Sequence, residues 1–403
     1  MADTTGETPD RLIDWATETE LFLETRPQGP IITVAVEPAA PRTASRLHFW
    51  RMAGAVVLSS LVGAAMATTV LLFGDGDDTP PTTTFAINVT ASADASPSNA
   101  AAVAARVIPS IVTVEVSHAE SDDFVADASG SGVVLDATGT IVTNQHVVDG
   151  AIAVRVVFSD GRTYEGTVIG EDALTDLAVL RIDTVGLTPI SIGSSQAMSI
   201  GDAAIAVGSP LGLEGGPSVT VGVLSAFDRT LRTSDDSQLF GLLQTDAPIT
   251  RGSSGGALVD SAGRLIGITS AIGVSDVGAE GLGFAIPVEM VQRITSDLIA
   301  SGISLHPFLG ITGVTHFTTQ ADGALAPDGV DITSVVPGTA ADVAGLAVGD
   351  TILTFDDEPL ITMDHLVVRL RYYRVGDTVR LGVSRGDEPM SLDVVLLERP
   401  EDV

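Results

Sequence analysis

The feature that most constrains the fold is a series of short Val- and Ile-rich runs between residues 100 and 287, separated by Gly, Asp and Thr. Examples are IVTVEV, AVRVVF and SVTVGVLSAF. The runs recur about every ten residues, a spacing that is typical of all-β sandwiches and barrels. Because this stretch is long for one barrel, the sequence predicts two β-barrels packed together.

The composition restricts the chemistry that such a fold can carry. There is no cysteine, and all 20 Lys+Arg positions are Arg. Thiol nucleophiles, disulfides, Cys-based metal sites, Ser–Lys dyads and P-loop ATP sites are thereby excluded. The net charge of −32, with its few Arg scattered along the chain, argues against nucleic acid as a partner. A serine nucleophile in this chain would need a histidine as its general base.

A candidate nucleophile lies in ITRGSSGGALVD, where Ser253 and Ser254 stand among glycines. Of the 6 histidines, only His146, in IVTNQHVVDGA, ends a strand within the β-rich block. Asp176 follows it in the chain and immediately precedes the apolar run LAVLRI. This order suits a triad in which the histidine takes the serine proton and the aspartate fixes the imidazole tautomer.

Two other interpretations of GSSGG have to be weighed. The pentapeptide matches G-x-S-x-G, the nucleophile elbow of α/β-hydrolases, which needs a helix after the serine and then Asp and His. Here ALVDSAGRLIGIT follows, and it alternates as strand, turn and strand. A plain Gly/Ser loop fits the pentapeptide alone, but it leaves the ordered His, Asp and Ser unexplained.

A membrane anchor is predicted at residues 53–73, which contain no charge and no proline. A helix needs about 20 such residues to cross a bilayer. Arg residues without acids precede the segment and three Asp follow it, so the N-terminus is expected on the cytoplasmic side of a bacterial membrane. We expect an uncleaved single-pass span, since a signal peptide would begin nearer the N-terminus. Residues 1–52 would be a largely disordered cytoplasmic tail, and residues 74–99 a flexible linker.

Four segments together resemble the HtrA (DegP/DegS-like) serine proteases, a branch of the trypsin-like fold. They are TNQHVV at 143–148, DALTDLAVL at 172–180, LQTDAPITRGSSGGALV at 243–259 and GLGFAIP at 281–287. The resemblance implies a mainly β protein in which a trypsin-like double β-barrel is followed by an α+β PDZ domain. With the predicted anchor, a single transmembrane helix would precede both.

The resemblance also implies the site residues of a protease domain spanning residues 100–304. His146 would be the general base, Asp176 the orienting acid and Ser254 the nucleophile. The backbone N–H groups of Gly252 and Ser254 would form the oxyanion hole, in which one donor is typically worth ~3 kcal/mol of the barrier.

One position departs from the family pattern, because Ser253 stands where Asn is usual. Since the oxyanion donors are backbone groups, we expect Ser253 to be dispensable and Ser254 to be essential. The substrate pocket is expected to be small and aliphatic. Trypsin-like enzymes that cut after Lys or Arg resemble one another in an Asp six residues before the nucleophile, where this chain has Pro248. Ile249 and Leu282 would line that pocket, which favours cleavage after Val, Ala or Ile.

The C-terminal residues 305–403 resemble a bacterial protease PDZ domain through VVPGTAADVAGLAVGDTIL. Helices are expected near 340–344 and 365–372. By the same resemblance a carboxylate-binding loop would capture a chain terminus while the peptide adds a strand; it comprises Phe308, Leu309, Gly310 and Ile311. An ordinary buried strand is the alternative for this stretch. The histidines of this module, expected at the surface and not as metal ligands, are His306, His316 and His365.

Three functions remain open. The first is a membrane-tethered, ATP-independent serine endopeptidase outside the cytoplasmic membrane, with no cofactor and no metal. It would cut unfolded or stress-exposed proteins, and the PDZ domain would recognise hydrophobic C-termini. The second is a PDZ-based chaperone or scaffold with little resting proteolysis. The third is a regulatory protease with one dedicated membrane-protein substrate. The family resemblance further implies a homotrimer.

Overall fold

The computed structural model describes most of the chain from residue 99 onward. Residues 91–403 form one compact unit. The predicted tail and the predicted span at 53–73 lie outside the described residues. Within the described part, no helix is both long and apolar enough to cross a membrane. The described ranges are 99–121, 123–209, 216–232, 238–270, 282–386 and 388–400.

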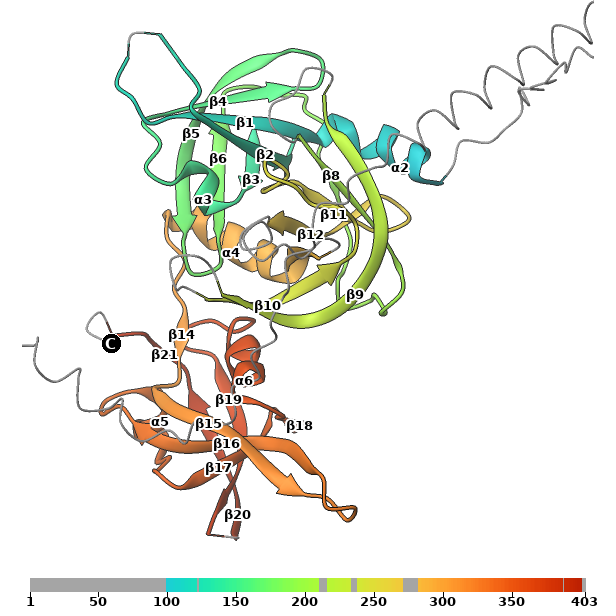
Figure 1. The fold of residues 1–403 in the computed structure, drawn as a ribbon. Helices are drawn as coiled ribbons and strands as arrows, with labels where there is room; N and C mark the ends of the chain where they lie inside the picture. The colour runs from blue at the N-terminus through green and yellow to red at the C-terminus, as the bar shows by residue number, and fades with distance from the viewer. Residues whose placement is uncertain are drawn as a thin grey trace, which may run out of the picture. The chain divides into compact units, whose positions relative to one another are not determined.

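The first barrel is closed, with strand order β1-β2-β3-β6-β5-β4 and β1 paired to β4 (Figure 1). Strand β4 alternates between half-buried and buried positions, as expected for a sheet with one face on a core. Closure leaves no unpaired edge. The six strands are β1 (Ile111–Ser117), β2 (Ala128–Val134), β3 (Thr140–Thr143), β4 (Ala153–Phe158), β5 (Thr163–Asp172) and β6 (Leu177–Ile182).

The second barrel follows the order β11-β8-β9-β10-β13-β12-β7, and β11 also pairs with β12, which closes the ring. Its core is built from Leu, Ile and Ala side chains such as Leu243, Leu258 and Ile266. The prediction of two β-barrels is confirmed. The strands are β7 (Ser191–Ile192), β8 (Ala203–Gly208), β9 (Ser218–Arg232), β10 (Gln238–Thr245), β11 (Ala257–Val259), β12 (Arg264–Ser270) and β13 (Gly283–Pro287).

Helix α4 (Val288–Ser301) packs against β5 and β6 of the first barrel and against β12 and β13 of the second (Figure 1). It starts after Pro287 and ends at Gly302, which has φ 80° and donates its N–H to Leu298 O. One helix therefore links the two barrels. The other helices of this region are α2 (Asn99–Val107), the 3₁₀ turn η1 (Ile108–Ser110) and α3 (Gln145–Val148).

The C-terminal module is a five-strand path, β15-β16-β17-β19-β20, with β18 paired to β17 and a separate β14-β21 pair. Helix α5 (Ala340–Ala344) lies where the sequence predicts it. Helix α6 (Met363–Leu370) begins after Thr362, whose hydroxyl accepts the His365 N–H at 3.1 Å. The strands are β14 (Pro307–Phe308), β15 (Ile311–Thr319), β16 (Leu325–Val335), β17 (Asp350–Phe355), β18 (Glu358–Pro359), β19 (Thr378–Arg385), β20 (Glu388–Val395) and β21 (Leu397–Glu398).

Polar contacts join the C-terminal module to the barrels. Arg374 Nη2 lies 3.1 Å from Asp297 Oδ1, and Thr230 Oγ1 donates to Asp364 Oδ2 at 2.9 Å. The prediction of a surface position is wrong for His306. Its side chain is only 12% exposed, because its Nε2 lies 2.9 Å from Asp172 Oδ1.

Candidate active site

His146 and Asp176 meet at the mouth of the first barrel. His146 lies on the short helix α3 that follows β3, and its Nδ1 is 2.8 Å from Asp176 Oδ1. The backbone N–H of His146 donates to the same oxygen at 3.1 Å. In a neutral imidazole, a carboxylate partner at Nδ1 favours the tautomer with its proton on Nδ1, which leaves Nε2 as an acceptor.

Asp176 has a left-handed backbone conformation, with φ 58°, and is only 3% exposed. Such a backbone is uncommon for a residue other than glycine. Two side chains fix it. Asn144 Nδ2 donates to Asp176 O at 2.8 Å, and Ser270 Oγ donates to Asp176 Oδ2 at 3.2 Å. Asp176 is therefore held from both barrels: Asn144, which follows β3, fixes its backbone carbonyl, and Ser270, which ends β12, contacts its carboxylate.

Ser254 lies beside the helix that carries His146. Its carbonyl accepts the Ser131 N–H at 2.7 Å, which ties the segment between β10 and β11 to strand β2. A Cβ placed on Gly130 would lie 2.7 Å from Val147 and 3.2 Å from Ser254 O, so glycine lets these two segments approach. Ser254 is 6% exposed.

The residues just before Ser254 form a tight turn. Ser253 N donates to Thr250 O at 2.9 Å, and Gly252, third in this turn, has φ 87°. A positive φ at the third position is the signature of a type II turn, and glycine adopts it without strain. Of the two predicted oxyanion donors, Gly252 thus belongs to a turn whose shape depends on a glycine, and Ser254 directly follows that turn.

Sequence reasoning missed several residues of this site. Asn144 and Ser270 support Asp176, while Ser131 and Thr269 bond the carbonyls next to Ser254. Ser131, Thr269 and Ser270 lie on strands, and Asn144 directly follows one. The sequence marks them only as polar residues in or beside a strand.

The two predicted pocket residues differ in exposure. Ile249 is 8% exposed and belongs to the core of the second barrel, where it packs against Gly283. A Cβ on Gly283 would lie 2.8 Å from the Ile249 side chain. Leu282, the residue before β13, is 38% exposed.

The predicted carboxylate-binding loop lines a groove of about 190 Å³ in the C-terminal module. Phe308–Ile311 form one side of it, and residues of α6 form the other. Gly310 has φ 87°, and a Cβ there would collide with Thr339. The α6 side chains are Met363, Leu366, Val367 and Leu370, and the groove is completed by Leu174, His306, Pro307, Arg371 and Arg399.

Three charged or titratable side chains, Asp172, His306 and Arg371, meet at one edge of this groove. Asp172 Oδ1 meets His306, and Asp172 Oδ2 accepts a hydrogen bond from Thr175. Burial raises the pKa of Asp172, but the hydrogen bond and charge of His306, the hydrogen bond from Thr175 and the charge of Arg371 outweigh it and leave the pKa below its usual value. The same Arg371 lies 3.3 Å from His306 Nδ1.

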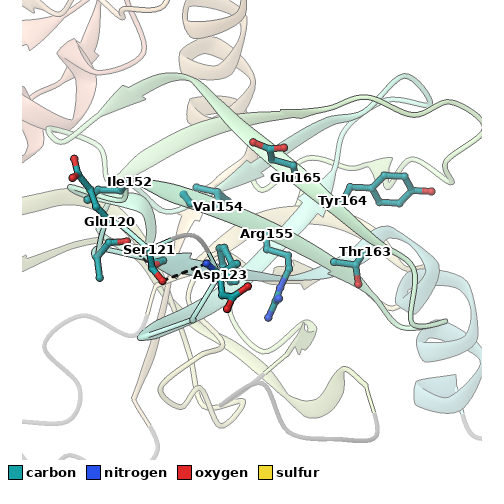
Figure 2. Close-up of a pocket in the computed structure, with 13 residues that line it drawn as sticks. Glu120, Ser121, Asp123, Ile152, Val154, Arg155, Thr163, Tyr164 and Glu165 are labelled. Atoms are coloured by element: carbon teal, nitrogen blue, oxygen red, sulfur yellow. Dashed lines mark hydrogen bonds between the residues drawn. The ribbon is translucent and has the colours of Figure 1, made fainter.

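A larger pocket, of about 860 Å³, lies on the outside of the first barrel (Figure 2). It is lined by residues of the segment after β1 and of β4 and β5, and none of His146, Asp176 and Ser254 borders it. Arg155, shown in Figure 2, pairs with Glu115 at 2.6 Å and stacks on Phe124. No cluster of His, Asp and Glu suited to a metal ion occurs within the described ranges.

Comparisons with known proteins agree with this architecture. Residues 130–268 match the family model of the trypsin-like peptidase domain, and residues 303–396 match that of the PDZ domain. The chain is 39% identical over 306 residues to the serine protease PepD of Mycobacterium tuberculosis, a match that covers 71% of this chain and 63% of PepD. It is 38% identical over 277 residues to the serine endoprotease DegS of Escherichia coli, covering 67% of this chain and 77% of DegS.

Solved structures give the same result. The HtrA-type protease AlgW with a tripeptide superposes with a TM-score of 0.61 at 32% identity, over 75% of this chain and 98% of that chain. The serine endoprotease from Yersinia pestis gives a TM-score of 0.55 at 31% identity, over 76% of this chain and 100% of that chain. The chain therefore belongs to the HtrA family of serine proteases, with a trypsin-like peptidase domain followed by one PDZ domain.

Proposed function

We propose that this protein is a serine endopeptidase in which His146, Asp176 and Ser254 are the catalytic triad. The observation that carries the proposal is the 2.8 Å contact between His146 Nδ1 and Asp176 Oδ1 at a site bordered by Ser254. His146 Nε2 would take the Ser254 proton as Oγ attacks the peptide carbonyl, and would then return a proton to the leaving amine. Asp176 would stabilise the imidazolium in between.

The developing oxyanion would be held by the N–H groups of Gly252 and Ser254. Gly252 lies in a turn closed by a hydrogen bond and Ser254 directly follows it, so little reorganisation would be needed as charge appears. Water then hydrolyses the acyl-enzyme by the same proton transfers in reverse. No cofactor is required for these steps.

The substrates proposed are unfolded or exposed polypeptides cleaved after small aliphatic residues. Ile249 would form the apolar floor of the pocket, and Pro248 provides no carboxylate to pair with Lys or Arg. The PDZ groove would bind C-terminal peptides, because Phe308–Ile311 face an apolar helix surface that suits a hydrophobic terminal side chain. A single-pass anchor at 53–73 would tether the enzyme outside the cytoplasmic membrane of a bacterium, in protein quality control or stress signalling. Trimer formation is proposed from family membership.

The proposal is tested by digesting unfolded casein with the purified full-length chain and mapping the cut bonds by mass spectrometry. We expect cleavage mainly after Val, Ala and Ile, and none by His146→Ala. Cleavage concentrated after Arg or Lys would contradict the pocket assignment. Cleavage by His146→Ala at the wild-type rate would contradict the triad.

A PDZ-based chaperone or scaffold is the second candidate, favoured by the well-formed groove under α6. It predicts that the wild type prevents aggregation of an unfolded protein and binds C-terminal peptides without cutting either. The same casein digestion therefore separates the two functions.

A further inference from the structure

Two buried hydroxyl groups hold the backbone carbonyls that precede Ser254. Thr269 Oγ1 donates to Ser253 O at 2.6 Å, and Ser131 Oγ donates to Gly252 O at 2.7 Å. Thr269 is 1% exposed and Ser131 is 0% exposed. The two residues come from different barrels, since Ser131 lies on β2 and Thr269 on β12.

The bond from Thr269 bears directly on an oxyanion donor. In a trans peptide the C=O and the following N–H lie in one plane and point in opposite directions. Fixing Ser253 O therefore fixes the direction of the Ser254 N–H. Gly256 N also donates to Ser253 O, at 3.0 Å, and the backbones of Gly255 and Gly256 are bonded to the backbone of Thr269. The Thr269 hydroxyl adds a side-chain hydrogen bond that joins the Ser253–Ser254 peptide plane itself to strand β12.

The bond from Ser131 secures the neighbouring peptide plane. Gly252 O and the N–H of Ser253 share that plane, and the N–H closes the turn to Thr250 O at 2.9 Å. Ser131 Oγ is itself aligned, because it accepts the Ser209 N–H at 2.8 Å, and its single proton is thereby directed to Gly252 O. A rotation of the Gly252 turn would break this hydrogen bond, whose donor Ser131 is fully buried.

We infer that Thr269 and Ser131 are positioning residues that keep the oxyanion donors aimed at the substrate carbonyl. The inference rests on the proposed protease function. In this inference neither hydroxyl contacts the substrate. The two hydroxyls stabilise the transition state, in which the oxyanion develops, and have little effect on the binding of the ground-state substrate.

The decisive variant is Thr269→Val, which replaces the hydroxyl by a methyl group of similar size. Thr269→Ser restores the hydroxyl. Thr295→Val is a matched control: Thr295 is buried in the same domain and donates to Val291 O at 2.7 Å, far along the chain from the site. Measurements on the full-length chain are kcat and KM for a peptide substrate, the inhibition constant of a peptide boronate that forms a tetrahedral serine adduct, and Tm.

We expect Thr269→Val to lower kcat by roughly tenfold or more, because full loss of one oxyanion donor costs about 100- to 1,000-fold. KM should stay within about twofold of wild type, and boronate affinity should fall by about the same factor as kcat. Ser131→Ala should act in the same direction. Thr269→Ser should recover most of the rate, and Thr295→Val should lower Tm without changing kcat.

Unchanged kcat and boronate affinity in Thr269→Val, with an active wild type, would overturn this inference alone. A loss in Thr269→Ser equal to that in Thr269→Val would overturn it as well, since the hydroxyl would then not matter. A wild type that neither cleaves the peptide nor binds the boronate would instead reject the proposed function, and the inference with it.

Discussion

Asp172 Oδ1 lies 2.9 Å from His306 Nε2, so the loop that leads to Asp176 is joined to the residues just before the predicted carboxylate-binding loop. Asp172 is four residues before Asp176, and His306 is two residues before Phe308. Leu174, inside the first loop, lines the PDZ groove directly. The groove and the loop that leads to Asp176 are therefore in direct contact, through Leu174 and the Asp172–His306 pair.

The Asp172–His306 pair predicts how the free energy of unfolding depends on pH. The pKa of Asp172 is lower in the folded protein than its usual value near 3.8, so the folded state gains stability from the ionised carboxylate above that value. This stabilisation is lost as the pH falls below the usual pKa and then through the pKa of Asp172 in the folded protein. Asp172→Asn should remove this contribution, so that its free energy of unfolding changes less than that of wild type between pH 6 and pH 3. Equal changes in the two proteins, measured by urea denaturation, would show that Asp172 does not contribute.

Gly255 is expected to tolerate no side chain. It has φ 82°, and a Cβ would lie 2.1 Å from Ser131 O. Gly255→Ala should therefore lower the free energy of unfolding by at least about 2 kcal/mol and abolish hydrolysis. Gly349→Ala is the control, because Gly349 has φ 91° with nothing within 4 Å of the added Cβ, and its cost should be about 1 kcal/mol. Similar losses in both variants would mean that backbone strain, and not the contact with Ser131, sets the cost.

Arg293 is a buried cation whose desolvation is poorly offset by hydrogen bonds or ion pairs. Its three guanidinium nitrogens lack hydrogen-bond partners among the described residues, and its nearest carboxylate oxygen, on Asp297, is 3.5 Å from Nη1. Burial lowers the pKa of Arg293, against the charges of Asp297 and Asp172. Arg293→Met should leave the free energy of unfolding unchanged or raise it by about 1 kcal/mol. Arg385→Met should lower it, because Arg385 Nε and Nη2 each lie 2.7 Å from an oxygen of the buried Asp350. A large loss in Arg293→Met would indicate that Arg293 stabilises the fold.

A substitution at Val367 tests whether peptides bind in this groove. It is half-buried on α6 and lines the groove opposite the carboxylate-binding loop. Val367→Asp should weaken binding of a peptide ending in Val by roughly tenfold or more, since a carboxylate replaces apolar contact surface and repels the terminal carboxylate. Val343→Asp serves as control, because Val343 is 76% exposed on α5 and lies outside the groove. Fluorescence anisotropy measures both. Equal affinities for the two variants would place the peptide elsewhere.

The sequence predicts the fold through signals that are local. Alternating Val and Ile runs mark the barrel strands, and VVPGTAADVAGL marks the PDZ module with its helix at 340–344. The second PDZ helix begins at Met363 and not near His365, because Thr362 caps it. Boundaries of this kind depend on a single side-chain hydrogen bond, which periodicity does not reveal.

The site is predicted less completely than the fold. His146 and Asp176 can be paired from their order in the chain, but the supporting hydroxyl of Ser270 and the buried position of His306 cannot. Both result from tertiary contacts between segments 94 and 134 residues apart. Polar residues on barrel strands, such as Ser131 in SGSGVV and Thr269 in IGITS, show where such contacts occur but not which partner they meet.

The most direct test compares Ser253→Ala and Ser254→Ala in the hydrolysis of unfolded casein by the full-length chain, with and without a peptide ending in a hydrophobic residue. Ser254→Ala should show no hydrolysis above background, while Ser253→Ala should stay within about tenfold of wild type, because only the Ser254 hydroxyl attacks the substrate carbonyl. Both variants should bind the peptide as wild type does, which shows that they are folded. Full activity in Ser254→Ala, or its loss in Ser253→Ala alone, would contradict the assignment of the nucleophile.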